Sequence, residues 1–82
     1  MFMDVAEITT LVQNALPSCE IQVQVDGSHC MVVAVGDVFE GLPTIKRQQL
    51  INKALFQMVM DGTIHALHPK AFTPAEWAAR QG

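Results

Sequence analysis

The sequence predicts an α+β fold in which helices pack on one face of a three-stranded mixed sheet. Three observations lead to this fold class. Two segments have apolar residues at helical spacing, two strand-like segments are joined by an Asp-Gly turn, and a strong helix start follows a third, short β-branched segment. In the resulting order, α-β-β-α-β-α, the third strand returns across the second helix, so it can lie parallel to one strand of the hairpin.

The first helix is predicted over residues 4–16. Asp4 is a suitable N-cap because its carboxylate can accept hydrogen bonds from the free N–H groups of the first turn. Pro17 prevents the helix from continuing. The apolar side chains recur at intervals of three and four, which places them on one face: Val5, Ile8, Leu11, Val12, Ala15 and Leu16.

A β-hairpin is predicted next. Residues 20–25 alternate polar and apolar, as in a strand with one buried face. Asp26 and Gly27 suit the tight turn, whose central residues need positive φ. The second strand covers residues 29–35, and its continuous apolar run predicts a central place in the sheet or cover on both faces.

The second helix is predicted over residues 44–58, after a turn-rich loop in which Phe39 is expected to anchor a short loop or single helical turn. Thr44 can cap this helix. Asp61-Gly62 ends it, because glycine accepts the left-handed conformation that follows many helices. One face carries Arg47, Leu50, Ile51, Ala54, Leu55 and Met58.

A short third strand is predicted over residues 63–67. Its alternation divides the residues between two faces, with Ile64 and Ala66 on one and His65 and Leu67 on the other. His68 precedes Pro69, and we expect it to lie in a solvated loop after the strand.

The last helix, residues 74–80, has the clearest start in the chain. Thr73 and Glu76 form a capping box, in which each side chain accepts a hydrogen bond from the other residue's backbone N–H. Pro74 stands at the first helical position, where its missing N–H would have no partner in any case.

Composition and charge restrict the function. The 82 residues, 50% of them apolar and 16% charged, suit one small packed domain over residues 1–82. The formal net charge of −3 gives no bulk attraction to nucleic acid. Two cysteines are too few for a disulfide framework, and no signal peptide or membrane-spanning stretch is evident. We therefore expect a cytoplasmic protein without membrane association.

Residues able to bind a metal gather around the second and third strands. From the residues alone, His65 is either a partly exposed strand histidine that donates a ring proton to a neighbour, or a ligand. His29 is either an ordinary polar residue beside a turn or a ligand, and Cys30 is either a small buried hydrophobe or a soft ligand. Their spacing does not match a zinc knuckle, which needs paired ligands at short, regular intervals.

We expect no enzymatic activity. The chain has no GxSxG motif, no cysteine with an evident partner base and no paired carboxylates in a recognisable setting. The cations Lys46, Arg47 and Lys53 gather on the second helix, where they form either a weak phosphate-contacting edge or a solvated helix face.

Several motifs together resemble the BolA-like family, and within it a short bacterial branch. They are VFEGLPTIKRQQLINKAL (residues 38–55), IHALHPKAFTPAEWAAR (64–80), NALP (14–17) and DGSH (26–29), which together span essentially the whole chain. The family's fold has the same α-β-β-α-β-α order and is related to the type II KH fold. Many members have Arg-His after the FEG loop; this chain has Arg47-Gln48, so no role of that histidine carries over.

The resemblance implies a partner protein. BolA-like proteins form complexes with monothiol glutaredoxins, often around a shared 2Fe-2S cluster, so it implies a role in iron–sulfur cluster handling or in iron or stress regulation. In such a complex the glutaredoxin cysteine and glutathione hold one iron. The BolA-like protein supplies the histidine of the IHAL-type motif, here His65, and in many members a ligand from the hairpin, where His29 or Cys30 stands.

Only one of these two hairpin residues is expected to face the same cleft as His65, because alternation points neighbours to opposite faces. We favour His29, whose position relative to FEG matches the bacterial branch, and keep Cys30 as the alternative. Imidazole in place of thiolate raises the potential of a cluster. It binds only when neutral, so such a site would weaken as the pH falls through about 7 to 6.

The KH-like fold leaves a second interpretation, a nucleic-acid-binding transcriptional regulator. KH domains clamp the nucleic-acid backbone with a GXXG loop between helices. The chain has no GXXG and its net charge has the wrong sign, so nucleic acid is possible but disfavoured as a partner. The free protein is expected to be a monomer or a weak homodimer.

Overall fold

The computed structural model describes residues 4–81 and confirms the mixed three-stranded sheet. Strands β1 (Glu20–Asp26) and β2 (His29–Val35) form the antiparallel hairpin, and β3 (Ala66–Phe72) pairs with β2 in parallel. The strand order is β1-β2-β3, so β2 is central, as its continuous apolar run predicts. The helices are α1 (Val5–Ala15), α2 (Thr44–Ala54), α3 (Phe56–Met60) and α4 (Pro74–Gln81), and a 3-10 turn, η1, covers Asp37–Phe39.

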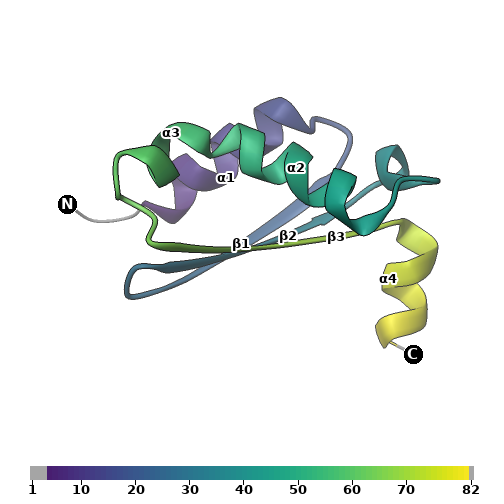
Figure 1. The fold of residues 1–82 in the computed structure, drawn as a ribbon. Helices are drawn as coiled ribbons and strands as arrows, with labels where there is room; N and C mark the ends of the chain where they lie inside the picture. The colour runs from purple at the N-terminus through teal and green to yellow at the C-terminus, as the bar shows by residue number, and fades with distance from the viewer. Residues whose placement is uncertain (1–3, 82) are drawn as a thin grey trace.

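The helices occupy two sides of the sheet. In Figure 1, α1, α2 and α3 cover one face, whereas α4 lies beyond the end of β3 and on the opposite side. The expectation that all helices share one face therefore holds for the first three only. Phe72 explains the difference: its ring centroid lies 5.2 Å from that of Trp77, which draws α4 toward the open face.

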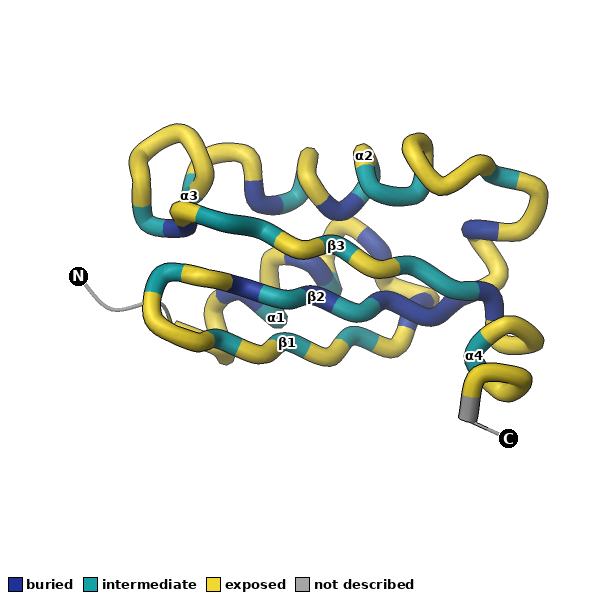
Figure 2. The backbone as a smooth tube through the Cα atoms, turned by 60° about the horizontal axis from the view of Figure 1, so that its bottom comes forward, coloured by how far each residue is buried: buried dark blue, intermediate teal, exposed yellow. Residues whose placement is uncertain are grey.

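The core lies between the sheet and the three covering helices. Side chains of β2 alternate, with Cys30, Val32 and Ala34 fully buried under the helices. The intervening β2 residues face the other way, onto an open sheet face that no helix covers along most of its length (Figure 2). The remaining core members come from the helices and loops: Ile8, Val12, Leu16, Cys19, Phe39, Ile51, Leu55 and Ile64.

Local chemistry explains the ends of the elements. Asp4 caps α1, since its Oδ1 accepts from the N–H of Ala6 at 2.9 Å and of Glu7 at 3.4 Å. The hairpin turn lies one residue later than predicted, because Asp26 ends β1 opposite His29 and the turn is Gly27-Ser28. Of these residues only Gly27 has positive φ, 61°. Phe39 is fully buried beneath η1, as predicted for the anchor of this loop.

The second helix differs from its prediction at both ends. Thr44 is its first residue and Pro43 occupies the N-cap position, without a side-chain cap. The helix also breaks at Leu55, whose φ of −112° is not helical and whose N–H bonds back to Asn52 O. Leu55 is 1% exposed, so the break accompanies insertion of its side chain into the core.

The predicted third strand, residues 63–67, is wrong in its bounds, because β3 runs from Ala66 to Phe72. The Thr63 N–H bonds to Asp61 Oδ1 and the Ile64 N–H to Met58 O, so these residues close α3 rather than join the sheet. Pro69 lies inside β3, which is possible because β3 is an edge strand whose outward N–H positions need no partner.

Candidate functional site

His29 and Cys30 begin β2 and point to opposite sides of the sheet, as alternation predicts. Cys30 is 0% exposed beneath the helices, whereas His29 is exposed on the open face. Burial raises the pKa of the Cys30 thiol. Because the thiolate is the form that binds metals, its surroundings disfavour Cys30 as a ligand.

His65 lies immediately before β3 and next to the hairpin. Its backbone N–H donates to Ser28 O at 3.1 Å, and the Ala66 N–H donates to the same oxygen at 3.3 Å. The register then pairs His29 with Ala66. The structure therefore brings His65 and His29 to neighbouring positions at one end of the sheet. In the sequence they are 36 positions apart, with α2 between them.

The predicted assignment of residues 64–67 to two opposite faces of a strand is only half right. His65 is exposed while Ile64 is 1% exposed, so these two do point apart. Within β3, however, Leu67 packs against the core and Ala66 takes the position across from His29 on the open face. His65 precedes the strand, so sheet alternation does not set the direction of its ring.

His68 is a strand residue, so its predicted place in a loop is wrong, whereas its predicted exposure to solvent is confirmed. It is exposed on the open face of β3, where its Nε2 lies 3.4 Å from Nδ1 of His29. The two ring planes are within 15° of parallel, and their centroids are 5.6 Å apart. A period-two signal was present in the alternation of His68 and Lys70 with their apolar neighbours, but Pro69 interrupts it.

The two rings line a shallow hollow at this end of the open face. Its volume is about 580 Å³, and its other lining residues are Gln24, Val25, Asp26 and Met31. Met31 is opposite His68 in the β2–β3 register, and Asp26 is opposite His29 in the hairpin. Within residues 4–81, no three His, Cys, Asp or Glu side chains are grouped closely enough to hold a metal ion.

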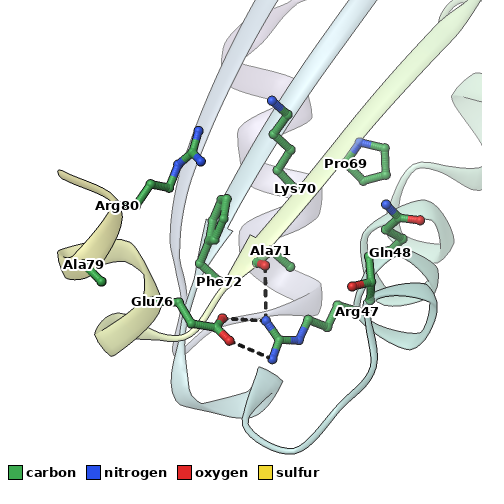
Figure 3. A pocket seen from close by; sticks show the side chains of 10 residues that line it. Arg47, Gln48, Pro69, Lys70, Ala71, Phe72, Glu76, Ala79 and Arg80 are labelled. Carbon is green, nitrogen blue, oxygen red and sulfur yellow. Dashed lines mark hydrogen bonds and ion pairs between the residues drawn. The ribbon is translucent and has the colours of Figure 1, made fainter.

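A second, larger hollow lies at the other end of the sheet, between α2, β3 and α4 (Figure 3). It has a volume of about 660 Å³, and Phe72 and Ala71 form part of its wall. Lys70 and Arg80 add positive charge, although the Arg80 guanidinium is occupied over the Phe72 ring, 5.0 Å from its centroid.

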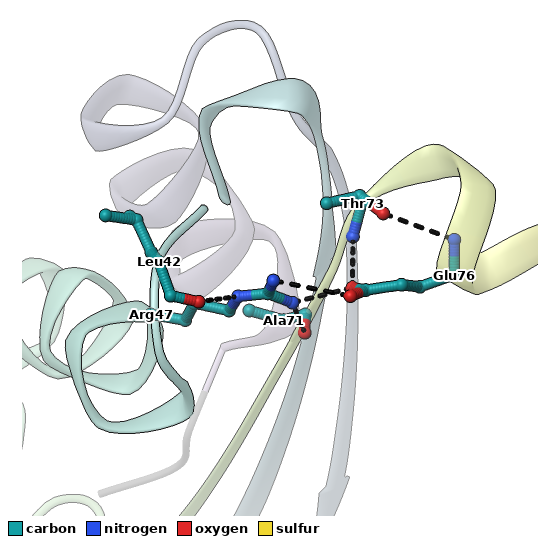
Figure 4. A network of polar contacts seen from close by, with 5 residues as sticks. All are labelled: Leu42, Arg47, Ala71, Thr73 and Glu76. Atoms are coloured by element: carbon teal, nitrogen blue, oxygen red, sulfur yellow. Dashed lines mark hydrogen bonds and ion pairs between the residues drawn. The ribbon is translucent and has the colours of Figure 1, made fainter. Parts of the chain in front are cut away.

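Arg47 joins three segments beside this hollow, which neither interpretation of the cations on the second helix, a phosphate-contacting edge or a solvated face, included. Its Nε donates to Leu42 O at 2.8 Å, and its Nη1 donates to Ala71 O at 3.4 Å and to Glu76 Oε1 at 2.6 Å (Figure 4). Hydrogen bonds from Arg47 and from the Thr73 backbone lower the pKa of Glu76 to about 2. The same carboxylate raises the pKa of Arg47.

The predicted capping box is confirmed in this network. The Thr73 N–H donates to Glu76 Oε1 at 2.9 Å, and the Glu76 N–H donates to Thr73 Oγ1 at 3.2 Å. Glu76 therefore has two tasks, since it caps α4 and binds Arg47 of α2.

No helix among the described residues is long and apolar enough to cross a membrane.

Comparisons with known proteins agree on one family. Residues 8–76 match the family described as BolA-like protein. The acid stress protein IbaG of Escherichia coli is 45% identical over 76 residues, which cover 93% of this chain and 90% of IbaG.

Solved structures show the same fold. A bolA protein homologue from Coxiella burnetii superposes with a TM-score of 0.78 at 28% identity, over 94% of this chain and 99% of that one. The BolA domain of SufE1 from Arabidopsis thaliana gives 0.75 at 31% identity, over 88% and 93%. The chain belongs to the BolA-like family.

Proposed function

We propose that this protein is a non-enzymatic partner of a monothiol glutaredoxin and that the two share a 2Fe-2S cluster. In this proposal His65 and His29 are the ligands from this chain, and glutathione and the glutaredoxin cysteine hold the other iron. The observation that carries the proposal is the joining of His65 to the hairpin. The hydrogen bond to Ser28 O places two exposed histidines, distant in sequence, at one end of the sheet.

The donor set fits this kind of cluster. Both imidazoles are exposed, so a partner protein can reach them without unfolding the sheet. Cys30, the alternative to His29, is 0% exposed and would have to leave the core to bind iron. Histidine ligands in place of thiolates raise the reduction potential of a 2Fe-2S cluster, as in Rieske centres.

The relatives supply the biological context of the proposal. IbaG is named an acid stress protein, and one structural neighbour is a domain of SufE1. We therefore propose that the shared cluster serves iron–sulfur cluster handling or a response to stress in the bacterial cytoplasm. A histidine ligand binds only in its neutral form, so a His-ligated cluster offers a direct link between acid and cluster loss.

Reconstitution tests the proposal. The purified protein is mixed with a monothiol glutaredoxin, glutathione, ferrous iron and sulfide under anaerobic conditions, and visible absorption and circular dichroism are recorded. We expect a mixed-complex spectrum that differs from that of the glutaredoxin cluster alone. His65→Ala and His29→Ala are each expected to alter it.

Two controls accompany these variants. Gln22→Ala changes an exposed residue of β1 and is expected to leave the spectrum unchanged. Size-exclusion chromatography of the cluster-free mixture separates loss of the complex from loss of a ligand. If His65→Ala forms the complex and its cluster spectrum matches that of the parent, the assignment of His65 is wrong.

A further inference from the structure

A third histidine, His68, faces His29 across the β2–β3 pair. Their nearest ring nitrogens, Nδ1 of His29 and Nε2 of His68, are 3.4 Å apart, a long hydrogen-bond distance whose donor depends on the tautomers of the two rings. The centroids are 5.6 Å apart and the ring planes within 15° of parallel. The distance between the two ring centroids exceeds the distance between the two nitrogens by about twice the radius of an imidazole ring. Both nitrogens therefore lie close to the line that joins the centroids. The rings are thus strongly offset and meet through these two nitrogens.

This contact distinguishes the two nitrogens of His29. Nδ1 is the nitrogen nearer the backbone and faces β3, which leaves Nε2 at the outer tip of an exposed ring. A neutral imidazole carries one proton, so a ring that donates through Nδ1–H presents an unprotonated Nε2. Histidine ligands in proteins commonly donate their second N–H to a neighbouring acceptor, which fixes both the tautomer and the ring orientation.

We infer that His68 is a positioning residue for His29: its Nε2 accepts the Nδ1–H of His29 and leaves the lone pair of His29 Nε2 free, so that it could bind an iron ion. This inference rests on the proposed function and adds a member to its site that does not touch the metal. His68 acts from the edge strand, so the second ligand is ordered by β3 as well as by the hairpin.

Asp26 is the competing acceptor. It is opposite His29 in the hairpin register and lines the same hollow. Asp26, however, forms no ion pair with His29; among the described residues the ion pair is that of Arg47 with Glu76. The contact that His29 does make is to His68.

The test uses the full chain without a cluster. Histidine side chains are labelled with nitrogen-15, and long-range proton–nitrogen correlations are recorded at about pH 8, where an ordinary imidazole is neutral. We expect His29 to be predominantly the Nδ1–H tautomer in the parent. His68→Leu removes the acceptor and is expected to abolish this preference. His68→Gln offers an amide oxygen and is expected to retain it. The backbone amide spectrum verifies that each variant is folded.

A His29 that is protonated on Nε2 in the parent would overturn the inference. So would a preference that survives His68→Leu, or one that is lost in Asp26→Asn instead. These outcomes concern the free protein, so they do not depend on whether a cluster forms.

Reconstitution with glutaredoxin supplies the second readout. Loss of such a supporting partner typically costs about 10-fold or more in metal binding. His68→Leu is therefore expected to shorten the lifetime of the mixed cluster by about 10-fold, and His68→Gln to restore most of it. If His68 sets the tautomer but His29→Ala leaves the cluster unchanged, the ligand role of His29 is wrong. In that case the ligand role of His29 in the proposed function is refuted, while the effect of His68 on the His29 tautomer still stands.

Discussion

Arg47 of α2 and Glu76 of α4 form a two-point ion pair, with Nη1 2.6 Å from Oε1 and Nη2 3.3 Å from Oε2. This pair connects the terminal helix to the layer of helices on the other face of the sheet. The Arg47 side chain is 15% exposed and that of Glu76 is 47% exposed, so the carboxylate side of the pair is open to solvent. The pair and the Phe72–Trp77 contact together hold α4 at the end of β3.

Loss of Arg47 is expected to lower the thermal midpoint more than loss of Glu76. Arg47→Ala leaves Leu42 O and Ala71 O without their donor, whereas Glu76→Gln keeps a polar side chain at the capping position. Thermal unfolding followed by circular dichroism at neutral pH measures both changes. Arg47→Lys keeps the charge and loses the fork, so a midpoint equal to that of the parent would show that the two-point geometry contributes nothing.

The Glu76 carboxylate is expected to make the fold acid-sensitive. Its pKa is lowered from 4.5 to about 2 in the folded chain, so below pH 4.5 the unfolded chain binds this proton more readily. The contribution is fully present above pH 4.5 and is lost as the pH falls to about 2. Urea unfolding across this window measures it. Glu76→Gln is expected to flatten the pH dependence, while Glu20→Gln, at an exposed site on β1, serves as the control; identical slopes for the parent and Glu76→Gln would contradict the prediction.

Substitution of Cys30 separates the two candidate ligands of the hairpin. Cys30→Ser places a hydroxyl in the core and is expected to cost about 1–3 kcal/mol of unfolding free energy. Its effect on the glutaredoxin cluster spectrum is expected to be small, because His29 and not Cys30 is exposed. Loss of the cluster in a folded Cys30→Ala variant, with retention in His29→Ala, would reverse this assignment.

Gly36 tests the packing at the end of β2. A Cβ at this position would lie 2.4 Å from Sγ of Cys19, which is too close for any real contact. Gly36→Ala is therefore expected to cost about 1–3 kcal/mol through overpacking. In a double-mutant cycle with Cys19→Ala, part of this cost is expected to be recovered, since the clashing sulfur is gone. If the two changes in unfolding free energy, measured by urea unfolding, simply add, the cost of Gly36→Ala does not come from contact with the Cys19 sulfur.

Local signals in the sequence predicted most of the fold. The alternation of residues 20–25 and the Thr73-Glu76 capping box each have a local cause, and each is present in the structure. The tight hairpin is present too, but its turn is Gly27-Ser28 and not the predicted Asp26-Gly27. The bounds of β3 could not be predicted in this way. Residues 66–72 form a strand because β2 offers an edge, and this pairing overrides the local signal of Pro69.

In the candidate site, too, the features with a local cause were predicted and those that depend on contacts between distant segments were not. The opposite directions of His29 and Cys30 follow from alternation within one strand, and the structure confirms them. The contact of His68 with His29, 39 positions apart, depends on the register between two strands and was missed. The role of Arg47 was missed for a similar reason, because its partner Glu76 lies on another helix.

Pulsed electron paramagnetic resonance of the reduced mixed cluster tests the central claim most directly. This protein is prepared with nitrogen-15-labelled histidine and assembled with unlabelled glutaredoxin, glutathione, iron and sulfide. Imidazole ligation from this chain predicts nitrogen-15 couplings in the spectrum, with the coupling assigned to His65 absent from the His65→Ala variant. A reduced cluster in a verified complex that shows no nitrogen-15 coupling would contradict the account.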